Sequence, residues 1–187
     1  MPKNMANYLT IGRVLMIPVF LVLMYVDFPG SRYWALAVYI VACLTDFADG
    51  YIARHYHQVS DFGKFMDPLA DKCLVMAALC CFVEQGDMLA WILAVVLVRE
   101  FAVSGMRLVA VEKGRVIAAA WSGKIKTAST MVCICLILFG IPHWLNIVCQ
   151  IIILVTTVYS GAEYFIKNAD VFKESKEAGH RRKSLLQ

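Results

Sequence analysis

Charged residues are scarce in this chain: they make up 17% of its 187 residues, whereas 60% are hydrophobic and the mean hydropathy is +0.67. Soluble domains carry about 25% charged and 45–50% apolar residues. Long polar inserts are lacking too, since the apolar runs follow one another along the sequence. We therefore predict an integral membrane protein that forms a single domain over residues 1–187, with a basic cytosolic tail from about residue 167.

The sequence also lacks the signs of a disulfide framework and of a cleaved signal peptide. Its seven cysteines are odd in number and all lie inside apolar runs, so we interpret them as small hydrophobic residues. Lys3 precedes an apolar run, as in a signal peptide, but Val14–Val26 ends without a small-x-small cleavage site. We expect this run to remain as a first membrane helix. No nucleic-acid partner is expected.

Six apolar stretches approach the roughly 20 residues that a helix needs to span a bilayer. They are Tyr8–Val26, Tyr33–Tyr56, Phe65–Val83, Leu89–Val111, Ile125–Phe139 and Trp144–Ile166. Turn signals separate several of them, namely Phe28-Pro29-Gly30, Gln85-Gly86-Asp87 and Gly140-Ile141-Pro142. These short loops hold a single cation, Arg32, whereas the other loops and both termini are basic. The positive-inside rule then predicts six transmembrane helices in the cell (inner) membrane, with both termini cytoplasmic.

Four aspartates stand close together within this apolar sequence. One Asp at the centre of a membrane helix costs about 2.5–3.5 kcal/mol on insertion scales, so a group of them indicates a function. The full pattern is Asp46-x2-Asp49-Gly50-x2-Ala53-Arg54-x8-Gly63-x3-Asp67-x3-Asp71. Positions three and four apart share a helix face, so each of the two helices presents its aspartates on one edge.

The depth of these residues predicts that the two edges meet. At 1.5 Å per residue, Asp46 and Asp71 both lie roughly 10 Å below the cytosolic boundary on antiparallel helices. Asp49 and Asp67 form a second pair whose members lie at equal depth. Like charges 4 Å apart repel by about 4 kcal/mol at an effective dielectric of 20, so cations must be present. Carboxylates favour hard divalent ions, and four negative charges balance two Mg²⁺ or Mn²⁺ ions.

The small residues of the pattern leave space beside this metal site. Gly50 and Ala53 share the aspartate edge, and Gly63 can likewise admit a ligand close to the backbone. Arg54, at the cytosolic end, suits a phosphate. Two metal ions can hold a pyrophosphate and activate a hydroxyl. The alternative from another class is a cation or proton carrier, because intramembrane carboxylates also mark transport pathways.

The pattern is the complete signature of the CDP-alcohol phosphotransferases, and the chain resembles that family. Three further segments are similar, Asn7-x2-Thr10-x2-Arg13-x4-Pro18, Val98-Arg99-Glu100-Phe101 and Gly123-Lys124-Ile125-Lys126-Thr127, of which the last two resemble bacterial members that use glycerol 3-phosphate. The resemblance covers about residues 5–140. It implies a six-helix membrane fold, a homodimer surrounded by membrane lipids, and transfer of a phosphatidyl group from CDP-diacylglycerol to an alcohol with release of CMP.

The resemblance also implies the role of each residue. The metal ligands would be Asp46, Asp49, Asp67 and Asp71, with Asp71 as the catalytic base for the acceptor hydroxyl. The residues that line the CDP pocket would be Gly50, Ala53, Arg54, Gly63, Asn7 and Thr10. The lipid tails of CDP-diacylglycerol would need a side opening between helices.

A group of cations predicts the acceptor. It comprises Arg99, Arg107, Lys124 and Lys126. Arg99 lies too deep to reach the boundary easily and cannot lose its charge, so a phosphorylated acceptor such as glycerol 3-phosphate is favoured. The lysines could instead serve topology or contact lipid headgroups, and Arg99 could neutralise Glu100 of a neighbouring subunit. Sibling activities remain open, namely phosphatidylinositol phosphate synthase and cardiolipin synthase.

Overall fold

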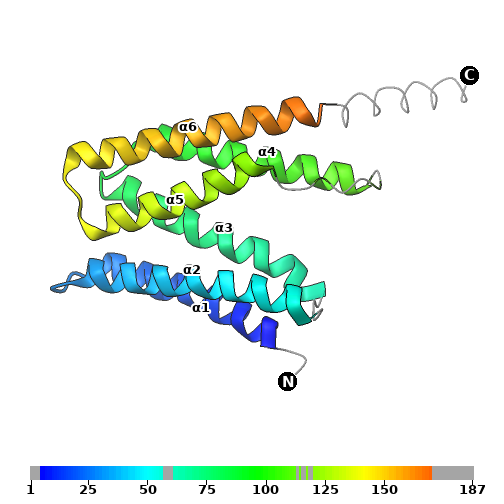
Figure 1. The fold of residues 1–187 in the computed structure, drawn as a ribbon. Helices are drawn as coiled ribbons and strands as arrows, with labels where there is room; N and C mark the ends of the chain where they lie inside the picture. The colour runs from blue at the N-terminus through cyan, green and yellow to red at the C-terminus, as the bar shows by residue number, and fades with distance from the viewer. Residues whose placement is uncertain (1–4, 57–60, 113, 115–116, 118–119, 170–187) are drawn as a thin grey trace, which may run out of the picture. The chain divides into compact units, whose positions relative to one another are not determined.

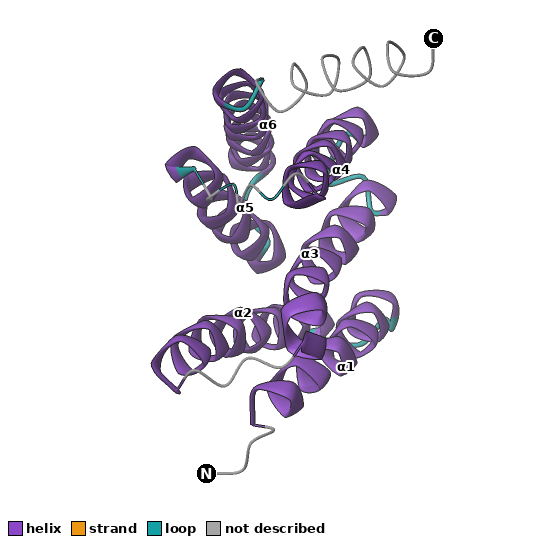
Figure 2. Cartoon of the chain, turned by 90° about the vertical axis from the view of Figure 1, so that its right-hand side faces the viewer, coloured by secondary structure: helices purple, strands orange, loops and turns teal. Residues whose placement is uncertain are grey.

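The computed structural model describes the backbone of residues 5–56, 61–112, 114, 117 and 120–169, and the side chains of 12–45, 72–112, 114, 117 and 120–169. Within these ranges the chain is helical and contains no strand (Figures 1 and 2). The helices are α1 (Met5–Tyr25), α2 (Ser31–Tyr56), α3 (Asp61–Glu84), α4 (Ala90–Glu112), α5 (Trp121–Phe139) and α6 (His143–Lys167).

All six apolar stretches predicted from the sequence are helices, and their bounds differ from the prediction by four residues or fewer. The largest differences lie at the starts of α3 and α5, where polar residues precede the apolar run. The expected turns are confirmed as well, because Gly30, Gly86 and Gly140 have φ of +88°, +78° and +85°. Glycine adopts this left-handed region without steric cost, which explains why the chain turns there.

The helices form two compact units, which we describe separately. Unit 1 comprises residues 1–89 and 131–147, and unit 2 comprises residues 90–130 and 148–187. In unit 1, α1 packs against both α2 and α3. Phe20 of α1 and Tyr39 of α2 are fully buried, with ring centroids 6.0 Å apart. This packing brings together the helices that carry the aspartate signature.

A polar network joins the loops of unit 1 at the end opposite the aspartates. Arg32, at the start of α2, forms an ion pair with Asp87 and also donates from Nη2 to the Ile137 carbonyl, at 3.0 Å. Asn146 donates from Nδ2 to the Asp87 carbonyl, at 2.8 Å. The Ile137 carbonyl belongs to the last turn of α5 and also accepts from the Gly140 backbone N–H, at 3.1 Å. The lone cation of the short loops therefore ties α2, α5 and the α3–α4 turn together.

Unit 2 contains α4, the first half of α5 and most of α6. Its buried cluster comprises Val103 and Met106 of α4 and Tyr164 of α6, with Ile117 packed against it. Polar side chains link the helices too, since Ser129 of α5 donates to Thr156 of α6 at 3.4 Å. The Thr130 hydroxyl donates to the Lys126 carbonyl one turn earlier, at 2.8 Å, so this buried polar group needs no partner on another helix.

Large apolar side chains cover much of the outer surface. Val98 and Phe101 of α4 and Ile166 of α6 are 69%, 73% and 77% exposed. Within the described side chains, α5 and α6 are long and apolar enough to cross a membrane, while α1 and α2 contribute the shorter apolar segments Gly12–Tyr25 and Ser31–Thr45. The all-helical fold is thus confirmed, and six membrane crossings remain a prediction.

Candidate active site

The aspartate signature lies where α2 ends and α3 begins. Asp46 is ten residues before the end of α2, and Asp71 is ten residues after the start of α3. Each is therefore about 15 Å along its helix from the 57–60 connection. Asp49 and Asp67 are seven and six residues from the same ends. The backbone thus keeps the two pairs level, but the four side chains lie outside the described residues and their convergence stays a prediction.

The predicted CDP pocket has the same status. Its residues belong to α1, α2 and α3, the three helices that pack together in unit 1. None of their side chains lies in the described part, namely Asn7, Thr10, Gly50, Ala53, Arg54 and Gly63. Among the described side chains, no group of three or more His, Cys, Asp or Glu could hold a metal ion. The metal assignment therefore rests on the donor chemistry of the aspartate pattern.

Arg13 is a buried cation to which sequence reasoning assigned no role. It lies on α1 and is 1% exposed. In unit 1, α1 packs beside the two helices that carry the aspartates. Arg13 and Thr10 are three residues apart and share a helix face. A guanidinium keeps its charge when buried, so this position requires negative or polar surroundings. The signal in the sequence was the presence of an arginine inside the first apolar run.

Two of the predicted acceptor cations meet on one carboxylate in unit 2. Arg99 Nη1 and Lys126 Nζ each lie 2.8 Å from the same oxygen, Glu100 Oε1. The side chains are 13%, 5% and 13% exposed for Arg99, Lys126 and Glu100. Glu100 of the same chain is therefore the carboxylate that neutralises Arg99. Two cations and one anion leave this triad with a net charge of +1, which suits an anionic ligand.

The other two acceptor cations have aromatic partners. Arg107 donates from Nε to the Tyr164 hydroxyl at 3.1 Å, and its guanidinium carbon lies 5.6 Å from the centre of that ring. Lys124 places its ammonium 4.8 Å from the ring centre of Trp121. Cation–π contacts of this kind hold a charge at a fixed place without neutralising it. The structure therefore brings Arg99 and Lys126 together, and it gives Arg107 and Lys124 separate surroundings.

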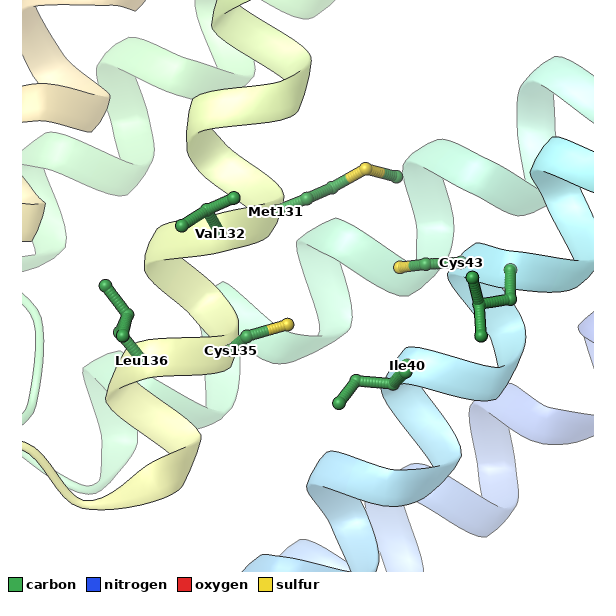
Figure 3. Close-up of a pocket in the computed structure, with 7 residues that line it drawn as sticks. Ile40, Cys43, Met131, Val132, Cys135 and Leu136 are labelled. Carbon is green, nitrogen blue, oxygen red and sulfur yellow. The ribbon is translucent and has the colours of Figure 1, made fainter.

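An apolar pocket of about 250 Å³ opens between α2 and α5 within unit 1 (Figure 3). Aliphatic and sulfur-containing side chains form its lining. Figure 3 shows Cys43 and Ile40 on α2 facing Cys135 and Met131 on α5. The complete lining is Ile40, Cys43, Leu44, Met131, Val132, Cys135 and Leu136. Such a surface offers contacts to hydrocarbon and none to a polar headgroup.

Comparison with known proteins defines the class. Residues 3–159 match the family model described as CDP-alcohol phosphatidyltransferase, and the chain belongs to this family. A relative from Bacillus subtilis (strain 168), named "CDP-diacylglycerol--glycerol-3-phosphate 3-phosphatidyltransferase", is 38% identical over 191 residues, covering 92% of this chain and 98% of the relative. A relative from Rickettsia bellii (strain RML369-C), with the same name, is 35% identical over 171 residues, covering 87% and 94%.

A third relative, from Mycobacterium tuberculosis (strain CDC 1551 / Oshkosh), is named "Probable phosphatidylglycerophosphate synthase". It is 36% identical over 167 residues, covering 86% of this chain and 79% of the relative. The family predicted from the aspartate signature is thus confirmed. Together with the apolar helices α5 and α6, family membership indicates a membrane protein.

Proposed function

We propose that this protein transfers the phosphatidyl group of CDP-diacylglycerol to glycerol 3-phosphate and releases CMP. The observation that carries the proposal is the uninterrupted signature from Asp46 to Asp71, in a chain that is similar over nearly its whole length to a relative named for this reaction. Over the whole reaction, the acceptor oxygen bonds to the phosphorus that carries the diacylglycerol. The bond from that phosphorus to the CMP oxygen breaks, and CMP leaves with the electron pair.

The aspartates would hold two divalent ions, Mg²⁺ or Mn²⁺. Their oxygens are the ligands that such ions take, and their helical spacing lets all four serve one centre. Bound there, the ions would neutralise the pyrophosphate and stabilise the attacking and leaving oxygens. Asp71 would accept the proton of the acceptor hydroxyl. Arg54 would contact a phosphate of the donor, while Asn7, Thr10, Gly50, Ala53 and Gly63 would line the nucleotide pocket.

The cations of α4 and α5 would bind the phosphate of the acceptor. The triad of Arg99, Glu100 and Lys126 retains one positive charge in a largely buried setting, where an anion is attracted more strongly than in water. Arg107 would supply a second charge, and Lys124 would contribute to the field around the phosphate. Serine, choline or ethanolamine carry no phosphate of their own and would gain nothing from these groups.

The acyl chains of the donor require an apolar path. The pocket between α2 and α5 has the right surface chemistry, and burying a hydrocarbon there would contribute about 25 cal/mol per Å² removed from water. We propose that one chain of CDP-diacylglycerol lies against Cys43, Met131 and Cys135 of this pocket. The assembly that we propose is a homodimer in the cell membrane, as the family resemblance implies.

One assay tests the reaction directly. Purified protein in detergent is incubated with CDP-diacylglycerol, a divalent ion and a panel of acceptors, and CMP release is measured with analysis of the lipid product. We expect turnover with glycerol 3-phosphate and little with serine. Preference for inositol phosphate or for phosphatidylglycerol would move the protein to a sibling activity. Absence of CMP release with every acceptor would contradict the proposal and favour an ion carrier.

We further propose six membrane crossings with both termini in the cytoplasm, and cysteine labelling tests this topology. The turn glycines Gly86 and Gly114 have φ of +78° and +71°, so a cysteine there would be strained. The exposed residues Asp27 and Glu112 are better positions. In a cysteine-free background, an impermeant thiol reagent applied to intact cells should label Asp27→Cys and not Glu112→Cys. Permeabilised cells should label both, and the opposite pattern in intact cells would invert the topology.

A further inference from the structure

The side chain of Arg99 runs between two other helices of unit 2 and meets a glycine on each. On α6, a methyl group added at Gly161 would lie 3.2 Å from Arg99 Cγ. On α5, a methyl group added at Gly123 would lie 3.6 Å from Arg99 Nη2. At the tip, Nη1 donates to Glu100 at 2.8 Å. The side chain of Arg99 thus approaches α6 with Cγ, α5 with Nη2 and Glu100 with Nη1.

Gly161 provides the closest of these approaches. Carbon atoms reach their optimal contact at about 3.5–4.0 Å, so a side chain at Gly161 would displace the Arg99 stem by a few tenths of an ångström. Contact at Gly123 would be ordinary by the same measure. A glycine inside a helix costs roughly 0.5–1 kcal/mol relative to alanine, because it loses more conformational freedom. The contact with Arg99 is a physical reason for glycine at the buried position 161.

Hydrogen bonds alone do not fix the guanidinium of Arg99. Its Nε is buried and finds no hydrogen-bond partner among the described residues. Among the described residues, rotation about the stem would therefore cost Arg99 a single hydrogen bond, that of Nη1 to Glu100. The direction of the guanidinium depends on the steric path of the stem between α5 and α6, and that path depends on the absence of a side chain at Gly161.

We propose that Gly161 is a positioning residue for the acceptor phosphate. It lets Arg99 pass close to α6, so that the guanidinium stays directed at a small phosphorylated alcohol while Glu100, which also pairs with Lys126, accepts a hydrogen bond from its tip. This inference rests on the function proposed above and extends it to α6, a helix on which no acceptor residue was predicted. It makes the direction of Arg99, and not its charge alone, a determinant of acceptor use.

The test compares Gly161→Ala with Gly105→Ala as a matched control. Gly105 lies on α4, is exposed, and has no atom within 4 Å of the added methyl group. Because a displacement of 1 Å can cost about a hundredfold, we expect Gly161→Ala to lower kcat/KM for glycerol 3-phosphate by roughly five- to twentyfold. The KM for CDP-diacylglycerol should change less than about twofold, and Gly105→Ala should alter neither parameter.

Thermal unfolding separates positioning from packing. Alanine is the better helix former, so Gly161→Ala should unfold at the wild-type temperature or above while acceptor use falls. If Gly161 only packs α4 against α6, Gly161→Ala should lower the unfolding temperature and should change the KM values of both substrates by the same factor. That result, or acceptor kinetics within about twofold of wild type for Gly161→Ala, would overturn the inference.

A double-mutant cycle with Arg99→Ala, which removes the Cγ that Gly161 contacts, tests whether Gly161 acts through Arg99. If it does, the loss caused by Gly161→Ala should shrink to less than about twofold in the Arg99→Ala background, since residues that act through one another are not additive. Full additivity would contradict the positioning role. Wild-type turnover with glycerol 3-phosphate tests the underlying function separately. If the wild type does not use this acceptor, both proposals are wrong. If the wild type turns over normally and Gly161→Ala does too, only the positioning role is wrong.

Discussion

Replacing any one of Asp46, Asp49, Asp67 or Asp71 by asparagine should lower turnover at least about a hundredfold, because each substitution removes charge from a shared metal site that works by positioning and neutralisation. Asparagine keeps nearly the same shape as aspartate, so the loss reports charge and not volume. The measurement is CMP release at saturating CDP-diacylglycerol and glycerol 3-phosphate. Asp27→Asn is the matched control, since this exposed aspartate lies in the turn between α1 and α2.

Removal of the metal gives the same test without a substitution. Activity should vanish in excess chelator and return when Mg²⁺ or Mn²⁺ is restored, because ligand carboxylates without their ions repel one another and the donor pyrophosphate. Full turnover in excess EDTA would refute the two-metal proposal. Near-normal turnover of Asp46→Asn or Asp67→Asn, with the control unchanged, would instead remove that residue from the metal site.

The second large effect concerns the acceptor. Lys126→Ala should raise the KM for glycerol 3-phosphate or lower kcat/KM by roughly ten- to a hundredfold, since hydrogen bonds to charged groups contribute about 1.5–3 kcal/mol. The triad explains the direction. With Lys126 present, its charges of +1, +1 and −1 sum to +1, and without Lys126 the remaining Arg99 and Glu100 cancel. A neutral pair attracts a phosphate far less.

Arg107→Ala should produce a loss of similar size, because the Tyr164 contacts hold its charge in place without neutralising it. Lys167→Ala is the control, as this lysine is 65% exposed at the end of α6 and pairs with Glu163. The KM for CDP-diacylglycerol should stay nearly constant in all three variants.

Free glycerol provides the complementary comparison, and it should be a very poor acceptor for the wild type. Glycerol lacks the phosphate that would bind the remaining positive charge of unit 2, and a site built to pair with a polar group discriminates strongly against an analogue without that group. Equal losses in donor and acceptor use after Lys126→Ala would indicate a structural role. If glycerol reacted nearly as well as glycerol 3-phosphate, the cations would serve the membrane surface and the acceptor would have to be assigned anew.

The sequence by itself determined the helices, the turns and the family. Apolar runs of membrane length predicted all six helices, and the glycines at the turn signals do adopt left-handed φ. These features depend on residues close together in the chain, so their pattern can be read from the sequence. The aspartate signature is equally local, since helical spacing alone puts Asp46 and Asp49 on one edge of α2 and Asp67 and Asp71 on one edge of α3.

Only the tertiary structure decided which charged groups meet. The sequence presented four cations as one group, namely Arg99, Arg107, Lys124 and Lys126. In the structure two of them, Arg99 and Lys126, form ion pairs with Glu100, and the other two contact aromatic rings. Likewise, the sequence shows Arg32 as the single cation of the short loops, and the structure shows that it binds Asp87 and the last turn of α5. Such partners depend on how helices rotate and tilt against one another. Side-chain packing between distant segments sets that rotation, and periodicity along one helix indicates which face packs inward but not which residue of another helix it meets.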